Sequence, residues 1–442
     1  MARIATLNDV DRDILRLALP ALGALVAEPL FLLTDTALVG HLGAVPLAGL
    51  SIGSAILQTV TGLLIFLAYA TTPAVARRLG AGDSVGAIRA GIDGMWLALA
   101  IGIGIVAIGV PTSGWLVRLF GATPLVSEAA HTYFGISLWG IPGMLLVIAA
   151  TGLLRGLQNT KTPLLVAIAG FGANAALSAI FIYGFGWGIA GSAIGTVVAQ
   201  WAMAAVYLVI AVRAARAAGA RLRPGFRGVG GAAHAGVWLL ARTLSLRAAM
   251  LATVFVAADF GITELATLQI ALTLFSTLAF ILDSLAIAGQ ALIGHGLGAA
   301  DVPRVSAITR RLVSHGLLTG AVLAIVILIL APLIGPVFSD DPAVHRMLTG
   351  TMLVMAGGIP LAGYVFVLDG VLIGAGDARY LAISGGVNLA MYAPLLIWLD
   401  VTHPAAGLSW LWAAFGFGYI GARALTLGLR ARGTRWIVTG VG

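Results

Sequence analysis

Two carboxylic acids lie inside one apolar stretch, residues 20–43 (PALGALVAEPLFLLTDTALVGHLG), which is long enough to span a bilayer. Glu28 and Asp35 are seven residues apart, about two helical turns, so both side chains point to nearly the same helix face. An acid at the centre of a membrane helix costs about 2.5–3.5 kcal/mol, and chains keep one mainly to bind a ligand, carry a proton or face a wet cavity. The pair therefore predicts a site for a proton or a cation.

Two prolines lie in the same stretch, Pro20 near its start and Pro29 between the acids. Each removes a hydrogen bond from a helix and permits a bend. We expect both residues to bend a helix that moves.

The composition places these acids in a membrane protein. The 442 residues are 60% hydrophobic and 10% charged, too few charges to cover a soluble protein of this size. There is no cysteine, which excludes disulfides and thiolate metal sites. The formal charge of +8 comes from basic residues dispersed in short loops, so we interpret it as a topology signal and expect no nucleic-acid partner.

Apolar runs of roughly 20 residues predict twelve membrane spans. They cover residues 14–39, 47–76, 92–111, 131–153, 163–184, 188–212, 236–258, 265–293, 311–334, 345–372, 379–399 and 404–428. With the N-terminus inside, 20 of the 25 Lys and Arg lie on the cytoplasmic side and only Arg118 and Arg346 lie outside. Because cytoplasmic loops are enriched in Lys and Arg, both termini are expected in the cytoplasm.

A basic linker, residues 213–235, divides the chain into an N-lobe of six spans (residues 1–212) and a C-lobe of six spans (residues 236–442). Shifting the sequence by 218 residues aligns LGA at 79–81 with 297–299, GIP at 140–142 with 358–360, and Gly43 with Gly261. Six spans return the chain to its starting side, so the repeat is parallel. The predicted fold is an all-α polytopic membrane protein with two parallel six-helix lobes, which is a transporter architecture.

Other polar residues lie inside the predicted spans. Asp283 and Asp369 have small neighbours, so helix packing beside a polar partner is about as well supported as contact with a substrate. Asn174 and Ser178 lie one turn apart in the fifth span, and Thr196 lies in the sixth. Interhelical hydrogen bonds are the usual role of such residues. Arg242, at the start of the seventh span, is expected to reach the inner interface or to pair with an acid; binding of a substrate anion is a further alternative.

Two signatures of enzymes and pumps are missing. The chain contains neither the HExxH motif of metalloproteases nor the P-loop of ATP-driven pumps. We therefore expect a protein that is not an enzyme, with no catalytic residue, metal or cofactor. Transport energy would come from an ion gradient.

Several motifs together resemble the MATE (multidrug and toxic compound extrusion) transporters, specifically the DNA-damage-inducible (DinF-type) branch. The motifs are DTALVGHLG at 35–43, ARRLGAGD at 76–83, LRGLQNTKTP at 154–163, LDSLAIAGQALIGHGLG at 282–298 and LDGVLIGAGD at 368–377. The resemblance covers essentially the whole chain. It implies two six-helix lobes around a cavity that opens alternately to the two sides of the membrane.

The resemblance also assigns roles to individual residues. It implies that Asp35 is the protonation site that couples cation entry to drug release, with Asn174, Ser178 and Thr196 beside it. Related proteins often have an aspartate where this chain has Ser178, which argues against a strong sodium site. In the MATE branch that has a glutamate in the seventh span, a C-lobe cation site is present; this chain has Leu246 and Arg247 in that region.

The resulting expectation is a proton-coupled antiporter for cationic or amphiphilic small molecules. We expect a monomer among membrane lipids in a bacterial plasma membrane. Asp35 and Glu28 are expected to couple transport to the cation or proton. The residues expected to bind the cation or the substrate are Asn174, Ser178, Thr196, Asp283 and Asp369. Sodium coupling stays open as an alternative. A second alternative is a flippase for lipid-linked precursors. The cavity of such a flippase should be lined by arginines deep in the N-lobe, whereas the N-lobe spans of this chain carry acids. A scaffold or receptor is a third, but it would not need intramembrane acids.

Overall fold

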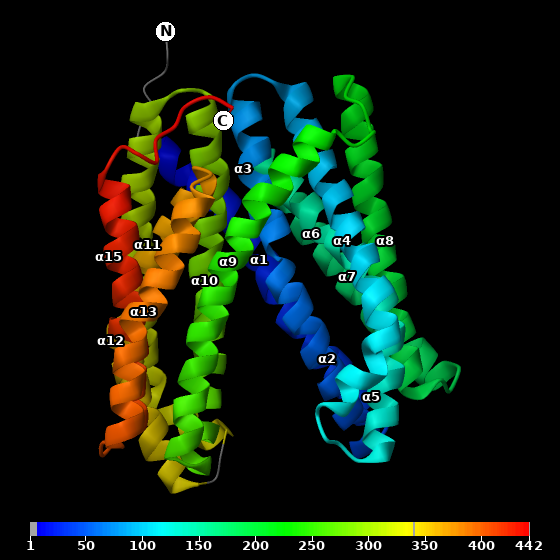
Figure 1. The fold of residues 1–442 in the computed structure, drawn as a ribbon, viewed down its shortest axis with the longest axis vertical. Helices are drawn as coiled ribbons and strands as arrows, with labels where there is room; N and C mark the ends of the chain where they lie inside the picture. The colour runs from blue at the N-terminus through cyan, green and yellow to red at the C-terminus, as the bar shows by residue number, and fades with distance from the viewer. Residues whose placement is uncertain (1–6, 339–340, 442) are drawn as a thin grey trace. The chain divides into compact units, whose positions relative to one another are not determined.

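The computed structural model describes residues 7–338 and 341–441, apart from the side chains of residues 7, 8 and 227 (Figure 1). The first half contains α1 (Leu7–Gly40), α2 (Ala44–Leu64), α3 (Phe66–Gly80), α4 (Ser84–Arg118), α5 (Pro124–Ser137), η1 (Leu138–Gly140), α6 (Ile141–Gly156), α7 (Lys161–Ala179), η2 (Ile180–Gly184) and α8 (Gly188–Ala218). The second half contains α9 (Phe226–Phe260), α10 (Ile262–Gly298), α11 (Val302–Phe338), α12 (Pro342–Gly374), α13 (Ala378–Thr402), α14 (Gly407–Ala413), η3 (Ala414–Tyr419) and α15 (Ile420–Arg432).

The helices correspond to the predicted spans. Among the described residues, 11 helices are long and apolar enough to cross a membrane. The twelfth predicted span, 404–428, falls on α14, η3 and α15, which follow one another directly and carry three arginines near the C-terminal end. The all-helical membrane fold is thus confirmed. Helix α1 passes through Pro20 and Pro29 without interruption.

Contacts divide the chain into two compact units. The N-terminal unit comprises residues 20–236 and the C-terminal unit comprises residues 237–440 together with residues 1–19. The first 19 residues thus group with the C-terminal unit, although they precede the N-lobe spans in sequence. Of the predicted linker 213–235, only residues 219–225 lie between helices, because α8 and α9 extend into it from both sides.

Both units repeat the same internal packing at the 218-residue offset. In each, a glycine on one helix lies so close to another helix that an added Cβ would lie 2.5 to 2.9 Å from the nearest backbone atom. The equivalent approaches are Gly102 to Pro142 and Gly320 to Pro360, and Gly152 to Ala68 and Gly370 to Ala286. Pairwise agreement of this kind at one fixed offset confirms the internal repeat in three dimensions.

The turns repeat as well. Gly43 (φ 112°) precedes α2 and Gly261 (φ 142°) precedes α10, and both take a backbone conformation that side chains with a Cβ rarely adopt. Gln158 (φ 58°) and Gly376 (φ 73°) end α6 and α12 in the same left-handed region. The helix ends that position the polar residues are therefore set by local sequence in each half.

Candidate functional site

Asp35 lies buried on α1, with 4% of its surface exposed. Ser192 on α8 donates a hydrogen bond to Oδ1 of Asp35 at 2.7 Å, and Tyr133 on α5 donates to Oδ2 at 3.4 Å. The apolar side chains of Val39 and Ile182 pack in the same cluster as Tyr133. Among the described residues Asp35 forms no ion pair, so its partners are neutral hydroxyls. A buried acid with this environment can exist with or without its proton.

The sequence predicted Asp35 but not its two partners. Ser192 could have been found, because it lies one helical turn before Thr196 and so shares its face of α8. Tyr133 gave no signal, since a tyrosine in an apolar run is usually a packing residue.

Asn174, Ser178 and Thr196 come together as one hydrogen-bonded cluster between α7 and α8. The Asn174 amide donates to Thr196 Oγ1 at 3.0 Å, and the Ser178 hydroxyl donates to Asn174 Oδ1 at 3.3 Å. All three residues are buried. Gly195 permits this approach, because an added Cβ would lie 2.8 Å from Ser178 Oγ. Ser192 and Thr196, one turn apart on α8, place this cluster next to Asp35.

Glu28 is exposed, unlike Asp35, and it lines two cavities of the N-terminal unit. The smaller cavity measures about 40 Å³ and is also lined by Asn174, Thr196 and Gln200. Gln200 Oε1 is buried without a hydrogen-bond partner, close to Gly140. A space of this size admits water, which needs about 10–15 Å³ and two to four polar partners. Glu28 therefore lines the same small cavity as Asn174 and Thr196 of the predicted cluster.

A second cavity, about 130 Å³, is also lined by Glu28. Its wall includes Thr151, Arg155 and Tyr207, and the Thr151 hydroxyl donates to Tyr207 OH at 3.2 Å. Glu28 is the one residue with a carboxylate that lines either cavity. The sequence supported a role in proton or cation binding less strongly for Glu28 than for Asp35. The position of Glu28 on the wall of both cavities now supports that role.

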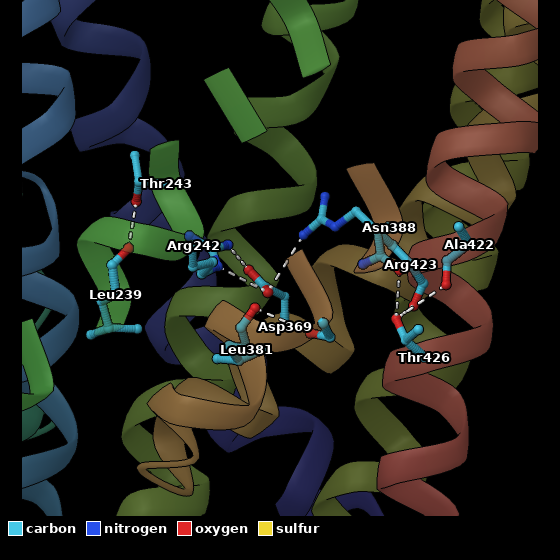
Figure 2. A network of polar contacts seen from close by, with 10 residues as sticks. Leu239, Arg242, Thr243, Asp369, Leu381, Asn388, Ala422, Arg423 and Thr426 are labelled. Carbon is cyan, nitrogen blue, oxygen red and sulfur yellow. Dashed lines mark hydrogen bonds and ion pairs between the residues drawn. The ribbon is translucent and has the colours of Figure 1, made fainter. Parts of the chain in front are cut away.

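Asp369 has a different setting in the C-terminal unit (Figure 2). Its carboxylate accepts hydrogen bonds from Arg242 on α9, including one from Nε at 3.2 Å, and lies 3.4 Å from Arg423 Nη2 on α15. All three side chains are buried. Asp369 thus lies in an ion-pair network, which does not fit its prediction as a ligand for a cation. The alternative in which Arg242 pairs with an acid is the one observed.

Two remaining features belong to the C-terminal unit. Asp283 is half-buried on α10 of the C-terminal unit. A cavity of about 630 Å³ is in the same unit, where Glu264, Arg346 and His403 are among the residues that line it. Most of its wall is half-buried or exposed surface, and we assign it no role.

One further enzyme signature, Gly-x-Ser-x-Gly, is present in the sequence. Residues 49–53, GLSIG, have the Gly-x-Ser-x-Gly spacing of a hydrolase nucleophile. They lie in the middle of α2, where the Ser51 hydroxyl donates to the Leu47 carbonyl at 2.9 Å. A nucleophile requires a sharp strand-to-helix turn at this point, so the spacing has no catalytic meaning here.

A polytopic helical fold with an internal repeat and buried intramembrane acids defines a membrane transporter. Comparisons with known proteins agree. The MatE family pattern matches residues 20–180 and, a second time, residues 239–398, so it follows the repeat. The chain belongs to the MATE family of transporters.

Individual relatives extend over nearly the whole chain. Protein DETOXIFICATION 45, chloroplastic, of Arabidopsis thaliana is 30% identical and covers 94% of this chain and 77% of that protein. DNA damage-inducible protein F of Escherichia coli is 26% identical and covers 96% of this chain and 92% of that protein, which fits the predicted DinF-type branch. A structure of a multidrug resistance MATE family transporter of the MOP superfamily, in an outward-facing conformation, matches with a TM-score of 0.86 at 21% identity, covering 96% of each chain.

Proposed function

We propose that this protein is an efflux antiporter that exports cationic or amphiphilic small molecules in exchange for protons. The observation that carries the proposal is Asp35, an acid buried in the N-terminal unit with only hydroxyl partners. Family membership supports the transport of small molecules, and the surroundings of Asp35 support the proton as the coupling ion.

The hydroxyl partners suit an acid that changes its protonation state. An ionised carboxylate only accepts hydrogen bonds, whereas a protonated one must also donate. Ser192 and Tyr133 can each donate or accept, so both forms of Asp35 can be satisfied without moving the backbone. A fixed cation such as arginine, which contacts Asp369 in the C-terminal unit, would instead favour the ionised form if it lay beside Asp35.

Glu28 provides a second group for the same proton. It shares the 40 Å³ cavity with Asn174 and Thr196, and Thr196 lies one turn from Ser192, the partner of Asp35. Water in this cavity would connect the two acids. We propose that a cationic substrate and the proton compete for these acids, and that their different affinities in the two states of the transporter couple the fluxes.

Sodium coupling is the second candidate, and one observation favours it. Glu28 and Gln200 both line the 40 Å³ cavity with Asn174 and Thr196, and Na⁺ binds oxygen ligands. The cluster beside them has a hydroxyl at Ser178 and an amide at Asn174, so Glu28 would supply the only negative charge. This shortage of charge makes the proton the better-supported ion. An anionic substrate, such as a lipid-linked precursor, is disfavoured because Arg242 and Arg423 both contact Asp369.

We further propose that the protein is a monomer in a bacterial plasma membrane, with both termini in the cytoplasm and lipid around its apolar helix faces. The distribution of Lys and Arg supports this orientation. Large apolar side chains such as Leu251, Phe255 and Ile329 are exposed on the helices and would contact lipid chains.

The experiment is a transport assay in proteoliposomes with a fluorescent organic cation as substrate. A pH gradient alone should drive transport, and a sodium gradient at equal pH should not. Transport driven by sodium alone would overturn proton coupling. Transport of an anionic pyrophosphate lipid in place of the cation would overturn the proposed substrate class.

A further inference from the structure

The first helix of each half passes from one unit into the other. Residues 7–19 of α1 belong to the C-terminal unit, whereas the rest of α1, with both acids, belongs to the N-terminal unit. Helix α9 does the reverse: residues 226–236 belong to the N-terminal unit and the remainder to the C-terminal unit. The two crossing points follow residues 19 and 236, nearly the repeat offset apart.

Ion pairs with α11 hold the start of α1. Asp11 accepts hydrogen bonds from both Nε and Nη2 of Arg311, a bidentate pair, and its Oδ1 lies 2.9 Å from His315 Nε2. Asp13 lies 3.1 Å from Arg304 Nη2. Since Arg304, Arg311 and His315 are spaced by seven and four residues, they share one face of α11. Bidentate Arg–carboxylate pairs fix geometry as well as charge.

An apolar stripe completes this attachment. Val10, Ile14, Leu17 and Ala18 are each at most 3% exposed, and their spacing of four, three and one residues places them on one side of α1. The first three turns of α1 are therefore packed as well as ion-paired.

A carboxylate on α4 holds the start of α9. Asp93 Oδ1 accepts the backbone N–H of Gly225, the residue just before α9, at 2.8 Å. An added Cβ on Gly228 would lie 1.9 Å from Asp93 Oδ2, so only glycine fits beside this carboxylate. The Trp96 indole on the same helix donates to the Leu222 carbonyl at 2.9 Å. A negative charge at the N-terminus of a helix is stabilised by the helix dipole.

The two attachments use the same position of the repeat. Asp93 and Arg311 are 218 residues apart, and they lie on the equivalent helices α4 and α11. One position thus carries opposite charges in the two halves, each matched to the helix start that it holds. Asp93 was not among the acids that the sequence singled out, because it lies near the end of its span.

We propose that Asp11, Arg311 and Asp93 are positioning residues for transport, which anchor the starts of α1 and α9 permanently to the unit in which they begin. The anchors stay closed through the cycle, so any conformational change of α1 and α9 takes place beyond their anchored starts. Glu28 and Asp35 lie beyond the anchored start of α1 and would take part in that change. This inference rests on the proposed transport function.

The absence of cysteine allows a direct test. In the Asp11→Cys/Arg311→Cys protein, a short bis-methanethiosulfonate reagent would link α1 to α11 through two disulfide bonds, with sulfinate as the leaving group. The substitutions remove the anchor and the link restores it, so the linked protein should transport the cation at least as fast as the same protein before linking. Arrest by the link, reversed by a reductant, would overturn the proposal because it would show that the anchor must open.

Amide hydrogen exchange of the purified protein measures how firmly the start of α1 is held, without a transport assay. Arg311→Ala should speed exchange in residues 9–19 and leave residues 20–40 unchanged, and the exchanged pair Asp11→Arg/Arg311→Asp should restore protection. Arg310→Ala, on an exposed neighbour, is the matched control and should change nothing. Unaltered exchange in Arg311→Ala would overturn the anchor. A wild-type protein that transports no cation would contradict the proposed function, while the exchange result would still decide the anchor.

Discussion

The two halves of this transporter place different chemistry at equivalent positions. Asp35 of the N-terminal unit corresponds to Thr253, and Asn174 corresponds to Tyr392. In the C-terminal unit Thr253 Oγ1 lies 2.8 Å from Tyr392 OH, and both residues are buried. The rings of Tyr392, Phe415 and Tyr419 then pack against one another with centroids 5.3 to 6.5 Å apart. Aromatic packing fills the place that holds acid and amide groups in the other half.

The positions that line the larger cavity of the N-terminal unit also carry different residues in the C-terminal unit. Ala24 and Thr151 line the 130 Å³ space, and their equivalents in the repeat are Arg242 and Asp369, which form the buried ion pair. An ion pair therefore lies at the positions that border open space in the other unit. The comparison indicates that one duplicated scaffold carries a buried acid and cavities in one half, and an ion pair and packed aromatic rings at the equivalent positions of the other.

The largest expected effect comes from removing the acid itself. Asp35→Asn keeps the shape of the side chain but cannot gain or lose the proton, so transport driven by a pH gradient should fall to the level of empty vesicles. Thr253→Ala, at the equivalent position, should retain transport. The measurement is initial uptake of a fluorescent cation in proteoliposomes. Equal losses in both variants would remove the distinction between the units.

The ion pair should matter for stability instead. Asp369→Ala leaves two buried arginines without this partner, and breaking a buried pair costs about 3–5 kcal/mol. Thr151→Ala, at the equivalent position, removes one hydrogen bond worth about 1 kcal/mol. Thermal unfolding of the purified proteins in detergent checks the difference. An Asp369→Ala protein as stable as Thr151→Ala would show that the network is not structural.

Substitution of Glu28 should slow transport without abolishing it. Glu28→Gln removes the carboxylate of both cavities, and proton-driven transport should slow about tenfold, or about 1.4 kcal/mol in barrier height. Leu246→Gln changes the equivalent residue of the C-terminal unit and should leave the rate within about twofold. Uptake rates at several imposed pH gradients measure this. A Glu28→Gln protein with the wild-type rate would remove Glu28 from the proton path.

The smallest effect is expected in the neutral cluster. Thr196→Val deletes the hydroxyl that accepts the Asn174 amide at 3.0 Å, a bond worth about 1 kcal/mol, so the half-saturating substrate concentration should rise about fivefold. Ala414→Val alters the equivalent site and serves as the control. Concentration series in the same vesicles test both. A rise in the control alone would place the binding determinant in the other unit.

The sequence predicted the features that depend on local pattern. Span positions follow from apolar run length, and the repeat follows from paired turns such as Gly43 and Gly261. It also predicted Asn174 with Thr196, through the resemblance. It could not predict that Tyr133 reaches Asp35 across 98 residues, or that Arg423 completes a network with Asp369, because those contacts depend on how distant helices pack. The assignment of residues 1–19 to the C-terminal unit was missed for the same reason.

Proton release on substrate binding tests the central claim most directly. In lightly buffered detergent solution, addition of a cationic substrate should release protons from the wild-type protein and from Thr253→Ala, as a pH dye would report, and should release none from Asp35→Asn. Proton release from Asp35→Asn equal to that of the wild type would contradict the assignment of coupling to this acid.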